Sequence, residues 1–188
     1  EAISSYKQAI RVEPNFTDAY NQLGTLYTFQ KNYEMAIKMF QGAVQSNQKF
    51  QSGYFNLGMI YEILGRHPEA IEQYNNILSL NPDHQKALLN LGWVMMDENR
   101  FMEAIPPLKH AIDLNLENID AHYTLGLVFG RLKRYQDAQD QYQKVLQLDP
   151  NHTEAYEKLA FTEQTIKNST VSTHKDVFHK EQNITLVP

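Results

Sequence analysis

A repeat of 34 residues constrains this chain more than any other feature of its sequence. Alanine and the dipeptide Leu-Gly both recur at this interval. The alanines are Ala2, Ala36, Ala70, Ala104 and Ala138, and the dipeptides begin at Leu23, Leu57, Leu91 and Leu125. No insertion or deletion interrupts the register between Ala2 and Leu159. Such a period predicts a stack of one small unit, because each copy can bury its apolar face only against its neighbours.

Each repeat has the pattern of two amphipathic helices, as the segment 51–84 illustrates. Between residues 54 and 61, large apolar side chains and glycine recur at intervals of three and four, which places them on one face of a helix. Gly65 opens a turn, and a second apolar helical face follows between residues 70 and 78. Pro82 ends this second helix, because the residue before a proline is pushed out of helical conformation. We therefore expect antiparallel helix pairs.

The glycine of each Leu-Gly dipeptide calls for a structural reason. Glycine inside a helix costs about 1 kcal/mol relative to alanine, so a close approach of two helices must return more than this. We expect Gly24, Gly58, Gly92 and Gly126 to face the small alanine of the second helix in the same repeat.

The spacing aromatic-x2-Leu-Gly-x2-Tyr, then Ala-x3-Phe/Tyr, then Pro resembles the tetratricopeptide repeat. The first complete repeat matches at Tyr20, Leu23, Gly24, Tyr27, Ala36, Phe40 and Ala43. Later repeats depart at Leu88, Met95, Leu108, Leu116, His122 and Phe129, and all of these except His122 are apolar. The resemblance covers residues 1 to about 167. It implies an all-α fold, a right-handed α-solenoid, or superhelix, of antiparallel helix pairs.

The register divides the chain into complete repeats and flanking segments. The complete repeats are 17–50, 51–84, 85–118 and 119–152. Residues 1–16 are expected to be the second helix of a truncated repeat, so we expect the native protein to continue upstream. Residues 153–167 are expected to form a capping helix, in which Glu163 replaces an apolar residue. Residues 168–188 are a non-repeat tail, because Ser172, Asp176 and His179 stand where alanine, an aromatic residue and alanine would recur.

No motif in the chain indicates catalysis or a bound cofactor. Phosphate-binding glycine loops, the nucleophile-elbow motif and the zinc-protease motif are all missing from the sequence. The histidines are scattered, and we expect His122 to be a packed, hydrogen-bonded histidine rather than a metal ligand. The net charge of −5 argues against a nucleic-acid partner, and no apolar run is long enough to span a membrane. We therefore predict no enzyme activity, no cofactor and no metal site.

The sequence leaves the cellular compartment open. The absence of cysteine fits a reducing compartment such as the cytoplasm. Four Asn-x-Ser/Thr sequences, at Asn15, Asn151, Asn168 and Asn183, would be glycosylation acceptors only in the secretory pathway.

The family resemblance implies a concave groove, lined mainly by the first helices at positions two, five, six, nine and twelve of each repeat. An apolar strip occupies these positions across three repeats, and a contiguous exposed apolar patch usually marks an interaction site. Gln22, Asn56 and Asn90 form a ladder of amides, which can donate to and accept from the backbone of a bound peptide. The candidate binding residues are Asn21, Gln22, Thr25, Phe55, Asn56, Met59, Lys86, Leu89, Asn90, Trp93, Met96, Tyr123 and Leu127.

Trp93 is the only tryptophan of the chain. It follows the Leu-Gly pair of the third repeat, whereas the tryptophan position of the family lies five residues earlier, at Leu88. Trp93 is therefore predicted to lie in the groove rather than in the core.

Some relatives bind acidic C-terminal peptides of chaperones through a clamp of two lysines, two asparagines and an arginine. Only Asn56 and Lys86 fit that clamp. Asn21, Thr25 and Asn90 stand where a lysine, an asparagine and an arginine would be needed, so a terminal carboxylate would find too few partners. The apolar groove favours a hydrophobic or amphipathic peptide instead.

These features predict a protein-interaction scaffold that binds a peptide or partner segment in the groove. Two alternatives remain open. The array could be the substrate-recognition region of a larger enzyme, for example a glycosyltransferase. It could also self-associate, through the groove or through the uncapped N-terminal helix.

Overall fold

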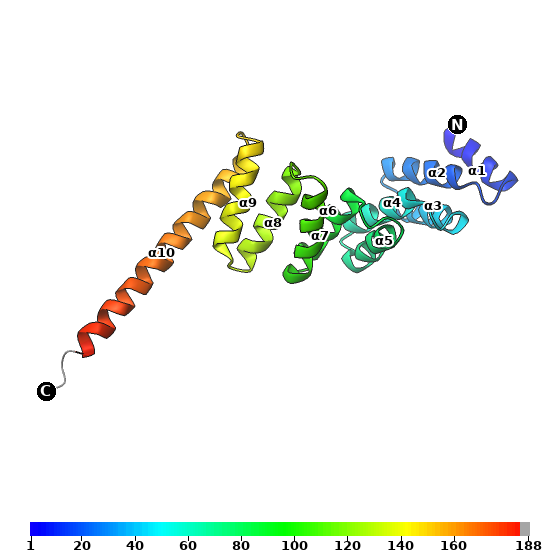
Figure 1. Ribbon diagram of the computed structural model, residues 1–188. Helices are drawn as coiled ribbons and strands as arrows, with labels where there is room; N and C mark the ends of the chain where they lie inside the picture. The colour runs from blue at the N-terminus through cyan, green and yellow to red at the C-terminus, as the bar shows by residue number, and fades with distance from the viewer. Residues whose placement is uncertain (185–188) are drawn as a thin grey trace. The chain divides into compact units, whose positions relative to one another are not determined.

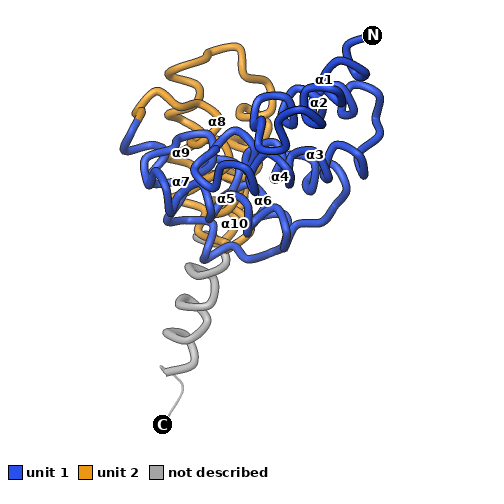
Figure 2. The backbone as a smooth tube through the Cα atoms, turned by 90° about the vertical axis from the view of Figure 1, so that its right-hand side faces the viewer, with its two compact units in different colours: residues 1–114 blue, residues 115–188 orange. Residues whose placement is uncertain are grey.

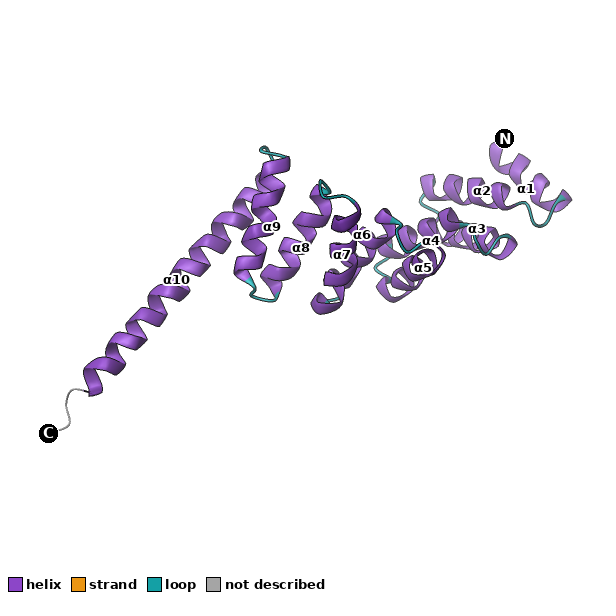
Figure 3. Ribbon diagram, viewed as in Figure 1, coloured by secondary structure: helices purple, strands orange, loops and turns teal. Residues whose placement is uncertain are grey.

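A computed structural model describes the backbone of residues 1–184 and the side chains of residues 1–169. The described residues form helices joined by short turns (Figure 1; Figure 3). In chain order the helices are α1 (Ala2–Val12), α2 (Thr17–Phe29), α3 (Tyr33–Ser46), α4 (Gln51–Ile63), α5 (His67–Leu80), α6 (Gln85–Asp97), α7 (Phe101–Leu114), α8 (Ile119–Arg131), α9 (Tyr135–Leu148) and α10 (Thr153–Ile184). The predicted all-α fold of helix pairs is confirmed.

The helices keep the register of the sequence repeat. The first helices of the repeats begin at Thr17, Gln51, Gln85 and Ile119, and each has 13 residues. The second helices begin at Tyr33, His67, Phe101 and Tyr135, and each has 14 residues. The period of the sequence is therefore the period of the structure.

The turn between the two helices of each repeat contains one residue in the left-handed region. These residues are Lys31 (φ 57°), Gly65 (φ 66°), Asn99 (φ 59°) and Lys133 (φ 58°). All four occupy the same position of the repeat. Only Gly65 adopts this conformation without the steric penalty that a Cβ atom brings.

The glycines of the first helices make room for a large side chain, which corrects the expectation that they face alanine. A Cβ atom on Gly58 would lie 2.7 Å from the ring of Tyr74, and one on Gly92 would lie 2.4 Å from Leu108. Gly24 and Gly126 meet Phe40 and Tyr142 in the same way. The residue four positions after each alanine therefore reaches across to the glycine, while the alanines themselves are buried.

The chain divides into two compact units, residues 1–114 (unit 1) and 115–188 (unit 2) (Figure 2). In unit 1, the two helices of each repeat pack closely on each other, and α1, α3 and α5 pack on the first helix that follows. In unit 2, α9 packs on both α8 and α10. Each core is built from the alanines, leucines and aromatic residues of the repeat pattern.

His122 of α8 is buried and hydrogen-bonded, as predicted. Its Nδ1 atom lies 2.8 Å from Oε1 of Gln141, and its Nε2 atom lies 3.2 Å from the carbonyl oxygen of Leu116. The two ring nitrogens are thus both occupied by protein partners.

The division of the chain into four repeats, a capping helix at 153–167 and a tail stays a prediction. The helix α10 continues past residue 167 to Ile184. The side chains of Ser172, Asp176 and His179, on which the non-repeat tail was predicted, lie outside the described residues, as does the backbone of residues 185–188.

Candidate functional site

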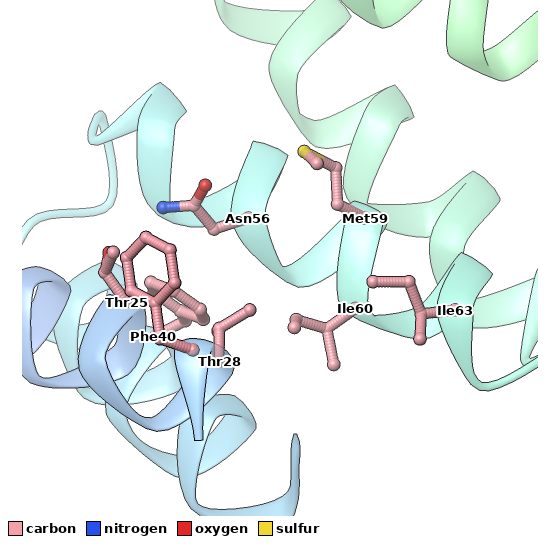
Figure 4. Close-up of a pocket in the computed structure, with 8 residues that line it drawn as sticks. Thr25, Thr28, Phe40, Asn56, Met59, Ile60 and Ile63 are labelled. Carbon is pink, nitrogen blue, oxygen red and sulfur yellow. The ribbon is translucent and has the colours of Figure 1, made fainter. Parts of the chain in front are cut away.

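Unit 1 has an apolar pocket on the first-helix side of its first two complete repeats (Figure 4). Its volume is about 110 Å³. Helices α2 and α4 supply most of the lining, and α3 supplies Phe40. The lining residues are Thr25, Thr28, Phe29, Phe40, Asn56, Met59, Ile60 and Ile63. Three of them, Thr25, Asn56 and Met59, were predicted from the sequence.

A second pocket lies between α4 and α6, with a volume of about 280 Å³. We call it the acidic pocket, and its lining residues are Glu62, Ile63, His67, Trp93, Val94 and Asp97. Trp93 is 45% exposed, so it does not belong to the core. Ile63 lines both pockets, which makes them neighbours on one face of unit 1.

Glu62 is held in place by a hydrogen-bonded chain that starts in the core. The ring of Tyr74 fills the space over Gly58 and is fully buried. The Tyr74 hydroxyl donates to Oε1 of Glu62 at 2.5 Å and accepts from Nδ2 of Asn90 at 3.1 Å. A core tyrosine therefore links a carboxylate of α4 to an amide of α6.

The surroundings of these hydrogen-bonded side chains raise the pKa values of both Glu62 and Tyr74. Burial raises the pKa of Glu62, although the Tyr74 hydroxyl and nearby His67 oppose that rise. Burial also raises the pKa of Tyr74 above its ordinary value, and the hydrogen bond to Glu62 adds to this effect. Both shifts show that charge on these groups is costly where they lie.

The predicted amide ladder is partly engaged within the protein. Asn56 donates from Nδ2 to Oδ1 of Asn21 at 2.9 Å, and Asn90 donates to Tyr74. A side-chain amide has two N–H donors and an acceptor oxygen, so both asparagines keep capacity for a further partner. Gln22 is exposed on α2. Binding of a peptide backbone by these amides stays a prediction.

Two of the predicted aromatic residues pack on the histidine that ends their own repeat. Phe55 lies 6.0 Å, between ring centroids, from His84, and Tyr123 lies 4.8 Å from His152. These histidines precede α6 and α10, and their Nδ1 atoms accept from the backbone N–H of Ala87 and Ala155. The aromatic ring at position five thus packs on the residue that caps the next first helix.

The remaining predicted residues line neither of the two pockets. Lys86 is exposed, whereas Leu89 and Met96 are half-buried on α6. Tyr123 and Leu127 are half-buried on α8 and belong to unit 2. Their role in binding stays a prediction.

The sequence-based prediction missed several residues that line the pockets, chiefly Thr28, Glu62 and Ile63. A signal for two of them was present, because Thr28 and Glu62 occupy position twelve of their repeats, the same position as Met96. Ile63 and Asp97 follow at position thirteen, which is the last residue of each first helix.

The described part of the chain contains no cluster of histidine and acidic side chains that could hold a metal ion. Among the residues that the structure describes, no helix has both the length and the apolar character needed to cross a bilayer. What the site offers is binding chemistry: apolar surface, an indole ring, amides and carboxylates.

Several solved structures have the same fold. YrrB, described as a tetratricopeptide-repeat protein with an unusual peptide-binding site, is 20% identical with a TM-score of 0.76, over 87% of this chain and 84% of its own. MamA from Desulfovibrio magneticus is 18% identical with a TM-score of 0.76, over 91% and 97%. The first tetratricopeptide-repeat domain of Spaghetti (RPAP3), solved with the HSP90 peptide SRMEEVD, is 24% identical with a TM-score of 0.61, over 62% and 93%.

Comparison with curated proteins finds no match to the chain, whereas comparison with family models does. Family models of the tetratricopeptide repeat match residues 5–38, 52–84 and 119–152, which together make up more than half of the 188 residues. The segments 52–84 and 119–152 coincide with the helix pairs α4–α5 and α8–α9, whereas 5–38 covers most of α1, all of α2 and the start of α3. The chain belongs to the tetratricopeptide-repeat family.

Proposed function

We propose that the protein is an interaction scaffold that binds a segment of a partner protein on the first-helix face of unit 1. One observation carries this proposal. Met59 and Trp93 occupy the same position of consecutive repeats, in the middle of α4 and α6, and they are 42% and 45% exposed. When a partner covers large apolar side chains that are exposed to water beside a pocket, their burial lowers the free energy of the complex.

The apolar pocket defines what kind of segment would fit. Its walls are methyl groups, a thioether and aromatic rings, with Thr25, Thr28 and Asn56 as the only polar side chains in the lining. An apolar side chain of the partner would enter the pocket, as in other grooves that take an amphipathic segment. Tryptophan is also among the residues that most often dominate binding energy at interfaces.

The fold supports this proposal, because YrrB is described as having a peptide-binding site and RPAP3 was solved with a peptide. We do not expect this chain to take the acidic peptide solved with RPAP3, since Asn21 and Asn90 replace a lysine and an arginine of the chaperone clamp and Thr25 replaces an asparagine. Binding without catalysis is part of the proposal.

Selection of random short peptides on the full chain, followed by titration, tests the proposal. Trp93 is the only tryptophan, so its fluorescence reports directly on occupancy of this face. We expect selected peptides to change that fluorescence and to bind Met59→Glu at least about tenfold more weakly, as for a residue of an interface centre.

Met102 provides a matched control. It is 65% exposed on α7, a second helix, and lines neither pocket. Met102→Glu should bind the selected peptides with the same affinity as the unmodified protein. Equal losses from Met59→Glu and Met102→Glu would contradict the proposal.

A second copy of the chain is the alternative occupant of this face. In that case the fluorescence of Trp93 would change on dilution of the protein alone, and sedimentation would show a dimer that Met59→Glu disrupts.

A further inference from the structure

The acidic pocket differs from the apolar pocket in its charge. Glu62 and Asp97 contribute two carboxylates, and its lining contains no lysine or arginine. His67 is the only cationic candidate in the lining. Its Nδ1 atom lies 2.7 Å from Oε1 of Glu98, and its Nε2 atom lies 3.5 Å from Oδ2 of Asp97. Asp97 and Glu98 thus hold the ion-pair contacts of His67, and Glu62 interacts with His67 only through a Coulombic attraction that opposes the rise in its pKa.

Glu62 is also fixed in position. Its partner in the core, the Tyr74 hydroxyl, is held over Gly58 and bonded to Asn90. The raised pKa of Glu62, caused by burial, shows that its carboxylate would gain from a positive charge that arrives with a ligand. A half-buried carboxylate strengthens such an attraction, because fewer water molecules screen it.

Trp93 supplies the third element, an aromatic ring in the same pocket as the two carboxylates. The face of an indole attracts an ammonium or guanidinium group, and it also packs against the aliphatic stem of lysine or arginine. With 45% of its surface exposed, Trp93 is accessible to such a side chain.

We propose that the acidic pocket receives a basic side chain, arginine or lysine, of the partner segment, with its stem on Trp93 and its charge beside Glu62 and Asp97. This inference rests on the proposed function, because the basic side chain belongs to the segment bound on this face. Ile63 lines both pockets, so the segment carries an apolar side chain and a basic side chain close together. The negative lining of the pocket selects against an acidic residue at this point.

A small probe tests the pocket without any knowledge of the partner. The full chain is titrated with N-acetyl-arginine N-methylamide and with its uncharged analogue N-acetyl-citrulline N-methylamide. The readout is the NMR signal of the single indole N–H. Arginine should shift this signal in a saturable manner, at least about fivefold more tightly than citrulline, as expected for a cation on a partly exposed indole beside a carboxylate.

Substitutions then identify the carboxylate. Glu62→Gln keeps an oxygen that accepts from Tyr74, so the pocket keeps its shape while it loses charge. This variant should bind arginine at least about threefold more weakly, which approaches a typical single ion-pair contribution. The matched control is Glu72→Gln, an exposed glutamate on α5 outside the pocket, which should leave the arginine titration unchanged.

The outcomes separate this inference from the proposed function. Equal shifts with arginine and citrulline, or equal arginine binding by Glu62→Gln and the unmodified chain, would overturn the acidic pocket as a site for a basic side chain. Selected peptides that depend on Met59 but keep their affinity when each basic residue becomes citrulline would also overturn it, while the proposed function stands. Failure to select any peptide would remove the proposed function, and the arginine titration would still decide the chemistry of the pocket.

Discussion

At the scale of single residues, the exposed Trp93 separates stability from binding. Because 45% of the side chain is exposed, Trp93→Ala should lower the free energy of unfolding by less than about 1.5 kcal/mol, in the range of partly exposed positions. A fully buried aromatic residue such as Phe40, which is 2% exposed, should lose about 3–5 kcal/mol on truncation to alanine. Denaturant unfolding of both variants, followed by circular dichroism, makes the comparison. A loss for Trp93→Ala as large as that for Phe40→Ala would place the tryptophan in the core.

Glu62 allows a prediction about pH. Its pKa in the folded state is raised by burial, so between the unfolded and the folded pKa values the native protein binds more protons than the unfolded chain. The contribution of this group to stability is then full below its unfolded pKa and is lost as pH rises through the folded value. Relative to the unmodified chain, Glu62→Gln should therefore be more stable at pH 7 than at pH 4.

The measurement is the difference in unfolding free energy between Glu62→Gln and the unmodified chain at each pH, which removes the titration of all other groups. A Glu62→Gln difference that falls as pH rises would mean that the Tyr74 and His67 contacts outweigh burial.

Residues also show where prediction from sequence ends. The repeat positions identify Gly58, Tyr74 and Asn90 separately, as structural glycine, core aromatic and groove amide. Their connection depends on the length of a tyrosine side chain, which carries its hydroxyl past Gly58 to Glu62. A phenylalanine at position 74 would have satisfied the same family pattern without this link. The repeat pattern accepts tyrosine and phenylalanine alike, so it does not predict that the residue at position 74 makes such a contact.

At the scale of helices and turns, the 34-residue period predicts most of the fold. Hydrophobic spacing sets the faces of each helix, and the proline and glycine positions set the turns. The left-handed residue in each turn has no clear sequence signal, because Lys31, Asn99 and Lys133 occupy it as well as Gly65. Packing of the two helices determines the turn, and the residue adapts to it.

The left-handed conformation at this turn position predicts opposite effects for a substitution to alanine at Gly65 and a substitution to glycine at Lys31. Gly65→Ala should cost about 1 kcal/mol from backbone conformation alone, because a Cβ atom there meets no neighbour within 4 Å. Lys31→Gly should be stabilising by up to about 1 kcal/mol, reduced by the larger entropy of glycine in the unfolded chain.

Thermal unfolding of each variant checks these signs. Lys38→Gly, an exposed position inside α3, is the control, since the same substitution within a helix should cost about 1 kcal/mol. If Lys31→Gly and Lys38→Gly destabilised equally, the turn would carry no strain that glycine relieves.

At the scale of the whole molecule, helices pack mainly on their neighbours in the sequence. The main contacts within unit 1 join helices that are adjacent in sequence, from α1 with α2 to α6 with α7. In such an architecture stability is roughly a sum of repeat and interface contributions. The proposed binding face on α2, α4 and α6 can therefore change its side chains one repeat at a time, while the packing of each helix pair is kept.

Local packing of this kind predicts that damage to one repeat stays local. Phe40 packs on Gly24 within the pair α2–α3, and Leu108 packs on Gly92 within the pair α6–α7. Native-state hydrogen exchange should show faster exchange in α2 and α3 for Phe40→Ala, with a smaller change in α6 and α7. Leu108→Ala, which truncates a fully buried leucine, should reverse this order. Uniform acceleration throughout residues 1–114 by both variants would show instead that unit 1 opens as a single cooperative body.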